Sequence, residues 1–295
     1  MSNQSKTQNP KEMEAKPPFP EQEQEPVGLE SEMEPRPDYG EESYRGSGKL
    51  QGKAAIITGG DSGIGRAVAL AFAREGADVL ISYLDEHSDA EETVRIVEKE
   101  GRRCIPLAGD IGEEAHCQEI VERAVQEFGK IDVLVNNAAW QEDIESIQDV
   151  TQEMLLHTYG VNIFAMFYLC KAAMPHMRPG STIINTTSIQ AYQPSPNLLP
   201  YSTTKGAILT FTKALSEEAI EQGIRVNAVA PGPIWTPLIP MSFEGSKVSK
   251  FGQDTPMGRP GQPAELAPVY VFLASTDSTY ITGECIGVTG GKPLS

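Results

Sequence analysis

The sequence predicts one α/β domain built on a doubly wound parallel sheet of seven strands with helices on both faces. Three observations support this fold class. From Lys53 onward, short β-branched runs alternate with helical apolar periods, which is typical of a parallel sheet with crossover helices. A glycine-rich turn joins the first strand to the first helix. The length of 295 residues and the apolar content of 39% suit one large domain of a soluble protein.

Seven short runs rich in β-branched residues are the predicted strands, and seven strands fit one domain. They cover residues 54–58, 79–82, 104–108, 133–136, 182–186, 225–230 and 284–288.

The predicted helices follow from apolar spacing. Between Ile64 and Phe72 the apolar residues recur at helical spacing on one stripe, and Gly76 is placed to end that helix. In the last helix Pro268 is an awkward interior residue, so we expect a kink or a late start there. The later helices are predicted at residues 91–100, 115–128, 152–177, 201–222 and 263–274.

Residues 1–48 differ in composition from residues 49–295, which form the predicted domain. They are crowded with Pro, Glu and Gln and hold few aliphatic residues, so they bury too little apolar surface to offset the entropy of ordering. Alone, this acidic arm is expected to be extended or disordered. Tyr39 and Tyr44 could anchor it on a subunit surface, and a solubilising tail is the alternative.

Charge and cysteine usage exclude several classes of protein. A formal charge of −17 repels nucleic-acid phosphates and anionic membranes. The N-terminus lacks a signal-peptide core, and the densest apolar run, 161–170, is too short for a bilayer, so we expect a cytoplasmic protein. The four cysteines are far apart, with no histidine at zinc-ligand spacing, so reduced thiols and no metal site are expected.

The glycine-rich turn reads T-G-G-D-S-G-I-G over residues 58–65 and opens directly into the first amphipathic helix. Glycines allow a sharp turn and close approach to a pyrophosphate, while the unpaired N–H groups at a helix start attract the anion. A strand, turn and helix in this order predict a dinucleotide site. A tight connection without a ligand is the competing interpretation.

The end of the second strand bears on the choice of nicotinamide cofactor. The segment Ser82–Glu86 contains no Lys or Arg that could pair with a ribose 2′-phosphate, which favours NAD over NADP. Tyr83, rather than an acidic residue, occupies the strand tip. Asp85 or Glu86 could instead accept hydrogen bonds from the ribose hydroxyls.

Further along the chain, three residues have side chains that suit proton-coupled hydride transfer. Ser188 follows a strand, Tyr201 begins a helix, and Lys205 lies four residues further on the same helix face. An ammonium beside the phenol, together with a cationic nicotinamide, is expected to lower the tyrosine pKa from about 10 toward neutrality. A Tyr and a Lys at this spacing also occur by chance on helix surfaces.

Together these motifs resemble the single-domain short-chain dehydrogenases/reductases, a family with a Rossmann-type fold. The resemblance covers residues 50–291, leaving an acidic Pro-rich N-terminal extension. Two departures stand out: Ala139 replaces a family Gly, and Thr289 replaces a family Asp. The matching motifs are T-G-G-D-S-G-I-G at 58–65, N-N-A-A at 136–139, Ser188, Y-S-T-T-K at 201–205 and P-G-P-I-W-T at 231–236.

The resemblance implies a catalytic tetrad in an enzyme that interconverts an alcohol and a carbonyl compound with NAD(P). Tyr201 would be the general acid for reduction and the base for oxidation, and Ser188 would bind the substrate oxygen. Lys205 would hold the nicotinamide ribose and depress the Tyr201 pKa. Asn162 would help to relay a proton to solvent, or else be a polar residue inside a helix.

The resemblance also implies a cofactor-binding set. In it Asp110 resembles the adenine contact, with a simple turn aspartate as the alternative, and Ile111 packs on the base. Ile234 and Thr236 would grip the carboxamide. Asn136 is expected to tie neighbouring strands together. The full set is Gly59, Asp61, Ser62, Gly63, Ile64, Gly65, Tyr83, Asp110, Ile111, Asn137, Ala138, Tyr201, Lys205, Pro231, Gly232, Ile234 and Thr236.

The substrate is expected to be selected by residues 237–258, called the substrate loop below, which should order over the cofactor. An amphipathic alcohol or carbonyl compound is expected, with sugars, polyols, steroids and aliphatic carbonyls all open. The residues expected near the pocket are Trp140, Gln190, Tyr192, Trp235 and Leu238.

Two other classes of function compete with the oxidoreductase hypothesis. One is a catalytically silent nucleotide-binding regulatory or interaction protein on the same fold, which the intact tetrad disfavours. The other is an epimerase or dehydratase that uses the nucleotide transiently, which the spacing of the glycine motif and the lack of a large substrate domain disfavour. The family resemblance further implies a homotetramer, in which the arm could lie against neighbouring subunits.

Overall fold

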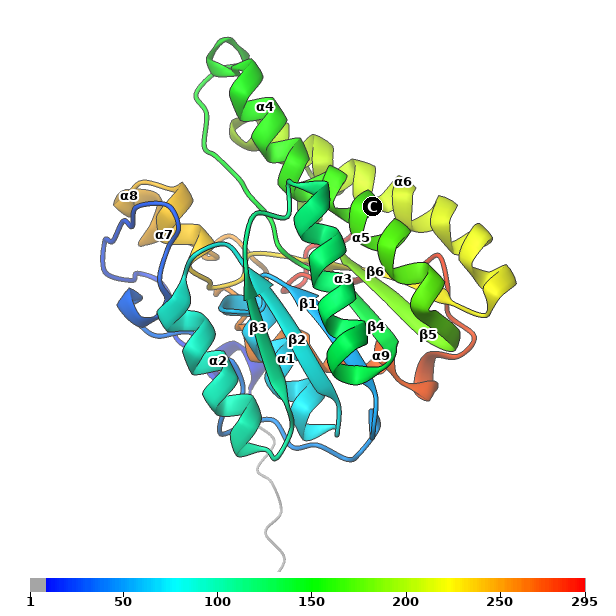
Figure 1. Ribbon diagram of the computed structural model, residues 1–295. Coiled ribbons are helices and arrows are strands. Elements are labelled where there is room, and N and C mark those ends of the chain that lie inside the picture. The colour runs from blue at the N-terminus through cyan, green and yellow to red at the C-terminus, as the bar shows by residue number, and fades with distance from the viewer. Residues whose placement is uncertain (1–8, 295) are drawn as a thin grey trace, which may run out of the picture.

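The apolar strands pair into one parallel sheet with the order β3-β2-β1-β4-β5-β6-β7 (Figure 1). The computed structural model describes residues 9–294. This arrangement confirms the predicted fold class, a single-domain Rossmann-type α/β fold. The strands are β1 Ala54–Thr58, β2 Asp78–Tyr83, β3 Cys104–Ala108, β4 Ile131–Asn136, β5 Met177–Thr186, β6 Arg225–Pro231 and β7 Cys285–Val288.

Alternating side chains of the strands build two apolar layers, because successive residues of a strand point to opposite faces. Ala55 and Ile57 pack with α1, α2 and α9, whereas Ile56 packs with α3, α5 and α6 on the other face. Both layers are apolar, as expected for a parallel sheet covered on both sides. The helices are α1 Gly63–Arg74, α2 His87–Lys99, α3 Glu114–Phe128, α4 Gln152–Tyr159, α5 Ala165–Ala173, α6 Leu199–Ala219, α7 Leu238–Ser242, α8 Gly245–Val248 and α9 Pro263–Ala274.

The helix predicted over residues 152–177 is not one regular α-helix. A π-helical segment, Gly160–Phe164, separates α4 from α5, and a short 3₁₀ turn, Met174–His176, ends the helical stretch. Met177 then begins β5, five residues earlier than the predicted strand. Only Met177 of the predicted range lies outside the helical stretch, and Pro175 lacks the N–H that would continue the α-helix.

Of the kink or late start expected at Pro268 in the last helix, the late start does not occur. The helix α9 begins at Pro263, where the missing proline N–H is not needed, and Gln262 and Glu265 form a reciprocal capping box. Pro268 lies inside the helix. In residues 9–294, no helix is both long enough and apolar enough to cross a bilayer.

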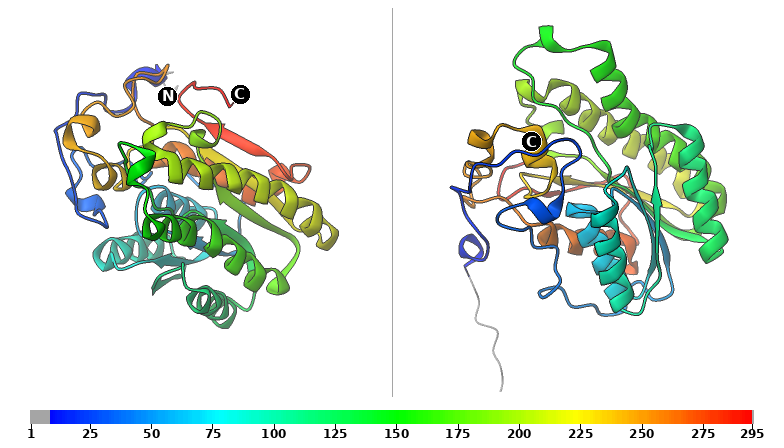
Figure 2. Two further views of the ribbon diagram at one scale, coloured as in Figure 1. Left: turned by 90° about the horizontal axis from the view of Figure 1, so that it is seen from above. Right: turned by 60° about the vertical axis from the view of Figure 1, so that its left-hand side comes forward.

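The described part of the arm, residues 9–48, follows an extended path interrupted by two 3₁₀ turns, Pro10–Glu12 and Glu30–Glu32. It lies against its own domain, beside α7 and α8 of the substrate loop, as the dark-blue segment in Figures 1 and 2 shows. Phe19 packs on the indole of Trp235 with ring centroids 4.4 Å apart. The N–H of Phe19 donates to Ser249 at 2.8 Å, so the arm contacts the substrate loop through backbone as well as side chains.

The end of the arm is fastened to α1 through Glu75. Its carboxylate accepts hydrogen bonds from the Tyr44 hydroxyl at 2.5 Å and from the N–H groups of Ser47 at 2.9 Å and Lys49 at 2.8 Å. Burial opposes ionisation, but these three donors outweigh it and hold the Glu75 pKa below its ordinary value. Glu75 therefore stabilises the fold above pH 4 to 5, and this contribution is lost as the pH falls through the lowered pKa.

Glu75→Gln is expected to reduce the free energy of unfolding at pH 7 by about 1–3 kcal/mol, because hydrogen bonds to a buried charged group are replaced by weaker ones. The difference from the parent chain should shrink below pH 4, where Glu75 itself becomes protonated. Denaturant titrations at pH 7 and pH 3.5 measure both values, with Glu98→Gln, exposed on α2, as the control. A difference that stays constant with pH would contradict this role of the charge.

Candidate active site

Two adjoining cavities lie where the loops after the parallel strands meet, at the carboxyl edge of the sheet. The first cavity is bounded by the glycine turn after β1 and by the segments that follow β2, β3 and β4. The second cavity is bounded by the segments that follow β5 and β6 and by the start of α6. Ile64, Asn137 and Thr236 line both cavities. The site thus lies beside the switch in strand order between β1 and β4, where ligands of doubly wound sheets bind.

The glycine turn has a backbone that only glycine provides at low cost. Gly59 and Gly63 hold φ angles of +59° and +51°, in the left-handed region. A Cβ atom at Gly65 would lie 1.8 Å from the carbonyl oxygen of Gly59, so glycine is needed there for α1 to approach the turn. Gly65 lines neither cavity, unlike the rest of the predicted set in this turn.

The first turn of α1 offers unpaired N–H groups beside the first cavity. The N–H of Gly63 donates to the carboxylate of Glu30 at 2.6 Å, whereas those of Ile64 and Gly65 have no acceptor within residues 9–294. Unpaired amides at a helix start, together with the helix dipole, attract an anion. The residues present therefore fit the pyrophosphate of a dinucleotide.

Two asparagines at the end of β4 hold the neighbouring segments in place. The Asn137 carboxamide donates to the carbonyl oxygens of Thr58 at 3.1 Å and Gly59 at 3.3 Å. The Asn136 carboxamide donates to Asn185 on β5 at 2.9 Å, the strand-tying contact that the sequence predicts. Asn137 thus fixes the glycine turn while it lines both cavities.

Among residues 9–294, those that line the first cavity include three carboxylates and no Lys or Arg. Asp61 is buried, and this burial, reinforced by the negative charge of Glu86, raises the Asp61 pKa to about 7. Glu86 lines the cavity and Asp85 does not. Asp110 also lines it, and its carboxylate accepts from the N–H of Gly112 at 2.7 Å, so it is a turn residue as well as a wall of the cavity.

The second cavity brings Ser188, Tyr201 and Lys205 together. All three side chains are buried, and Lys205 is only 1% exposed. Its ammonium donates to the carbonyl oxygen of Thr186 at 3.0 Å and lies 5.1 Å from the centre of the Tyr201 ring. The sequence spacing i, i+4 thus places the cation beside the phenol.

The predicted fall of the Tyr201 pKa is not found in the chain by itself. Burial raises the Tyr201 pKa to about 12, although a hydrogen bond with Ser188 acts in the opposite direction. Burial likewise lowers the Lys205 pKa to about 7. The predicted fall rests on the attraction between the ammonium and the phenolate. Desolvation opposes it, because burial disfavours both charged forms.

Asn162 does not line either of the two cavities. It lies in the π-helical segment, and its side chain accepts from the N–H of Trp140 at 2.8 Å and donates to the Trp140 carbonyl at 2.9 Å. A further hydrogen bond of 3.0 Å reaches the Thr204 hydroxyl on α6. The structure therefore places Asn162 as a link between the loop after β4 and the helix that carries Tyr201 and Lys205.

The other residues of the predicted cofactor set line one cavity or both. They are Gly59, Asp61, Ser62, Gly63, Ile64, Tyr83, Asp110, Ile111, Asn137, Ala138 and Thr236 in the first cavity, and Ile64, Asn137, Tyr201, Lys205, Pro231, Gly232, Ile234 and Thr236 in the second.

Two residues expected near the substrate pocket are elsewhere. Trp235 is fully buried under Phe19 of the arm, and Tyr192 lines neither cavity. Both follow pocket residues in sequence, but their side chains are directed into other contacts. Trp140, Gln190 and Leu238 do line the cavities.

The arm contributes cavity residues that sequence reasoning missed. Val27 and Gly28 line the first cavity. They lie in a segment without apolar periodicity or a motif, so no signal in the sequence marks them. The substrate loop contributes Met241 to the first cavity and Phe243 and Phe251 to the second.

Comparisons with known proteins identify relatives of this chain. Residues 59–292 match a family model described as enoyl-(acyl carrier protein) reductase. An uncharacterized oxidoreductase of Bacillus subtilis, YhdF, is 55% identical over 287 residues, which are 97% of this chain and 99% of that protein. Glucose and ribitol dehydrogenase of Daucus carota is 49% identical over 280 residues, 92% and 96% of the two chains.

Solved structures show the same likeness. A short chain dehydrogenase from Burkholderia cenocepacia in complex with NADP has a TM-score of 0.77 and 30% identity, covering 82% of this chain and 98% of that one. A 3-ketoacyl-(acyl-carrier-protein) reductase from Brucella melitensis complexed with NADH has a TM-score of 0.75 and 35% identity at the same coverage. The chain belongs to the short-chain dehydrogenase/reductase family. It is an oxidoreductase that binds a nicotinamide cofactor.

Proposed function

We propose that this protein interconverts an alcohol and a carbonyl compound, with Tyr201 as the general acid and base. The observation that carries this proposal is the meeting of Ser188, Tyr201 and Lys205 in a cavity that adjoins the glycine turn. No observation favours a catalytically silent role, because the three reactive side chains line a cavity that could admit a substrate.

In this proposal Ser188, Tyr201 and Lys205 have different roles in proton transfer. When bound, the nicotinamide supplies the hydride for carbonyl reduction and accepts it in alcohol oxidation. In reduction the Tyr201 hydroxyl donates its proton to the substrate oxygen, to which the Ser188 hydroxyl also donates a hydrogen bond. The Lys205 ammonium, beside the phenol, stabilises the phenolate that remains. In oxidation the proton moves back from the alcohol to Tyr201.

The walls of the second cavity support an amphipathic substrate. The segment after β5 contributes the amide and hydroxyl side chains of Gln190, Ser195 and Asn197 to the lining. The substrate loop contributes Phe243 and Phe251. The name of the carrot relative supports sugars and polyols as a first choice. Steady-state assays should therefore test the oxidation of glucose and ribitol with NAD⁺ and NADP⁺, and the reduction of a series of aliphatic aldehydes with NADH and NADPH. Nucleotide binding without turnover of any of them would favour the silent alternative.

We further propose that NAD is the preferred cofactor. A ribose 2′-phosphate needs a cation, and the described residues that line the first cavity include Asp61 and Glu86 but no Lys or Arg. Leu84 follows the tip of β2 and lines the same cavity.

Leu84→Arg is expected to tighten NADPH binding by about tenfold, because a guanidinium forms a strong ion pair with a phosphate, while NADH binding changes little. Fluorescence titration with each nucleotide measures both dissociation constants, and Leu84→Gln is the uncharged control. A parent chain that already binds NADPH more tightly than NADH would overturn the proposed preference.

We also propose a homotetramer, since Leu156, Phe164 and Phe167 remain 40–57% exposed along α4, the π-helical segment and α5. Light scattering should give four times the 32.0 kDa mass of the chain. Phe167→Glu should reduce this mass, because a charge cannot be buried unpaired in an interface. A monomeric parent chain would contradict the proposed assembly.

A further inference from the structure

A turn of the arm, residues 24–30, forms part of the wall of the first cavity. The Gln24 side chain closes this turn by accepting from the N–H of Leu29 at 2.6 Å and donating to its carbonyl at 3.1 Å. Between these residues, Val27 and Gly28 line the cavity that the glycine turn bounds on its other side. We call residues 24–30 the arm turn.

The arm turn is in close contact with the start of the substrate loop. A Cβ atom at Gly28 would lie 2.8 Å from the carbonyl oxygen of Pro237, so no larger residue fits without displacing one of the two segments. The N–H of Gln24 donates to the carbonyl of Pro240 at 2.9 Å. The wall that Val27 and Gly28 form is therefore fixed to the loop that borders both cavities.

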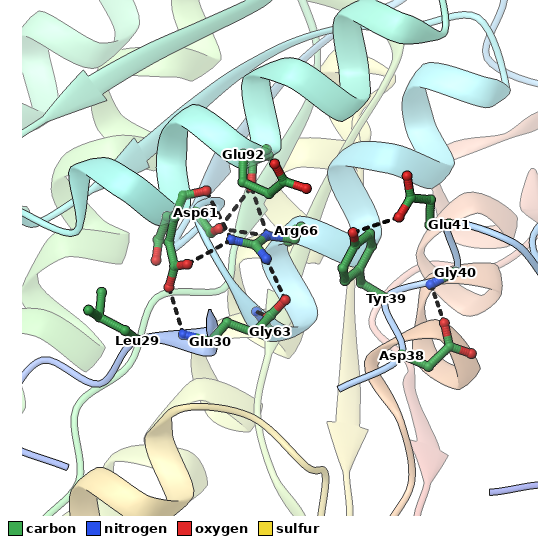
Figure 3. A network of polar contacts seen from close by, with 12 residues as sticks. Leu29, Glu30, Asp38, Tyr39, Gly40, Glu41, Asp61, Gly63, Arg66 and Glu92 are labelled. Carbon is green, nitrogen blue, oxygen red and sulfur yellow. Dashed lines mark hydrogen bonds and ion pairs between the residues drawn. The ribbon is translucent and has the colours of Figure 1, made fainter. Parts of the chain in front are cut away.

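Glu30, at the end of the arm turn, reaches the glycine turn itself (Figure 3). One carboxylate oxygen accepts from the N–H of Gly63 at 2.6 Å, and the other pairs with Arg66 on α1. The N–H of Glu30 donates to the Asp89 carboxylate at 2.8 Å. Glu30 is only 3% exposed and does not line the cavity, so its carboxylate holds the glycine turn from behind.

Glu30 and Arg66 do not form an isolated ion pair. Arg66 also contacts the Asp89 carboxylate at 3.1 Å, so two carboxylates share one guanidinium, and Asp61 lies nearby. Burial raises the Glu30 pKa, against the lowering effects of Arg66 and of the Gly63 N–H. Asp89 contacts the Nη2 atom of Arg66, whereas Glu30 supplies the acceptors for the Nη1 atom of Arg66 and for the N–H of Gly63.

We propose that the arm turn is a built-in part of the nucleotide site, in which Glu30 is a positioning residue. By holding the N–H of Gly63 it fixes the glycine turn, so that the N–H group of Ile64, which lines the cavity, stays free for the pyrophosphate. Val27 and Gly28 form the outer wall against the same nucleotide. This inference rests on the proposed function of the cavity as a dinucleotide site.

The test compares variants of the full chain by NADH titration and, without nucleotide, by thermal melting. Glu30→Ala removes the acceptor and is expected to raise the NADH dissociation constant about tenfold. Glu30→Gln keeps an acceptor for Gly63 and should stay within about threefold of the parent chain. The matched control is Glu32→Gln, an exposed residue of the same 3₁₀ turn.

Gly28→Ala tests the wall independently, since its methyl group would push the arm turn away from Pro237. It should raise the NADH dissociation constant about tenfold while the melting temperature stays near that of the parent chain. If Glu30→Ala does not fold, Gly28→Ala decides the question.

The outcomes separate this inference from the function on which it rests. Variants that lower the melting temperature but bind NADH as the parent chain does would make the arm turn merely structural and overturn the inference. A parent chain that binds neither NADH nor NADPH would instead remove the proposed function, and the inference with it.

Discussion

Replacing Tyr201 with phenylalanine is expected to lower kcat for carbonyl reduction by a factor of about 10² to 10⁴, the typical contribution of a positioned general acid. The substitution removes only the hydroxyl that faces Ser188 in the second cavity. The ring remains to pack in its buried site, so the melting temperature should change little. NADH affinity should stay within about threefold, because the first cavity is untouched.

Tyr192→Phe is the matched control, because Tyr192 also carries a phenol and follows β5 but lines neither cavity. It should keep the parent kcat. Steady-state kinetics on the best substrate of the panel, with NADH binding measured in parallel, provide the comparison. If Tyr201→Phe keeps full activity, the assignment of Tyr201 as the proton donor is wrong.

Lys205→Met is expected to reduce kcat/KM by about 10² or more, since the phenolate of Tyr201 loses the cation that stabilises it. Nucleotide binding should weaken as well, because the resemblance to the family assigns Lys205 to the nicotinamide ribose. Lys213→Met, an exposed lysine of the same helix, should leave both values unchanged. Equal loss in the two variants would indicate a general effect of charge rather than a contact in the site.

The same substitution is expected to raise the melting temperature at neutral pH. Burial lowers the Lys205 pKa to about 7, so between pH 7 and about 10 the unfolded chain binds a proton that the folded chain does not. Stability of the parent chain therefore rises with pH across this window. The advantage of Lys205→Met should be largest at or below pH 7 and should vanish near pH 10. A lower melting temperature of Lys205→Met at every pH would contradict this prediction. It would mean that contacts of the Lys205 ammonium in the folded chain offset the cost of its desolvation.

The sheet could be predicted from the sequence because each strand carries its signal locally. Buried parallel strands are continuous apolar runs, and the run Ala54–Thr58 is buried at every position. The i, i+4 spacing of Tyr201 and Lys205 is likewise a local property of one helix. Where a site residue lies on a regular element next to a motif, sequence spacing is enough to place it.

Features that depend on distant partners could not be predicted in this way. The π-helical segment holds Asn162 against Trp140 and Thr204, contacts that no periodicity reveals. The arm has too few aliphatic residues to fold alone, yet Phe19 packs on Trp235, more than two hundred residues away. The prediction of a lowered Tyr201 pKa was wrong for the same reason. The burial that raises this pKa is set by the whole cavity rather than by Lys205, its neighbour on the helix.

The most direct test of the account follows a label from cofactor to product. NADH deuterated at both C4 positions of the nicotinamide is incubated with the chain and the aldehyde and sugar panel, and the alcohols formed are analysed by mass spectrometry. The account predicts one deuterium on the former carbonyl carbon with the parent chain and at least a hundredfold slower labelling with Tyr201→Phe. Bound NADH with no label transferred to any panel member, or equal labelling by both chains, would contradict it.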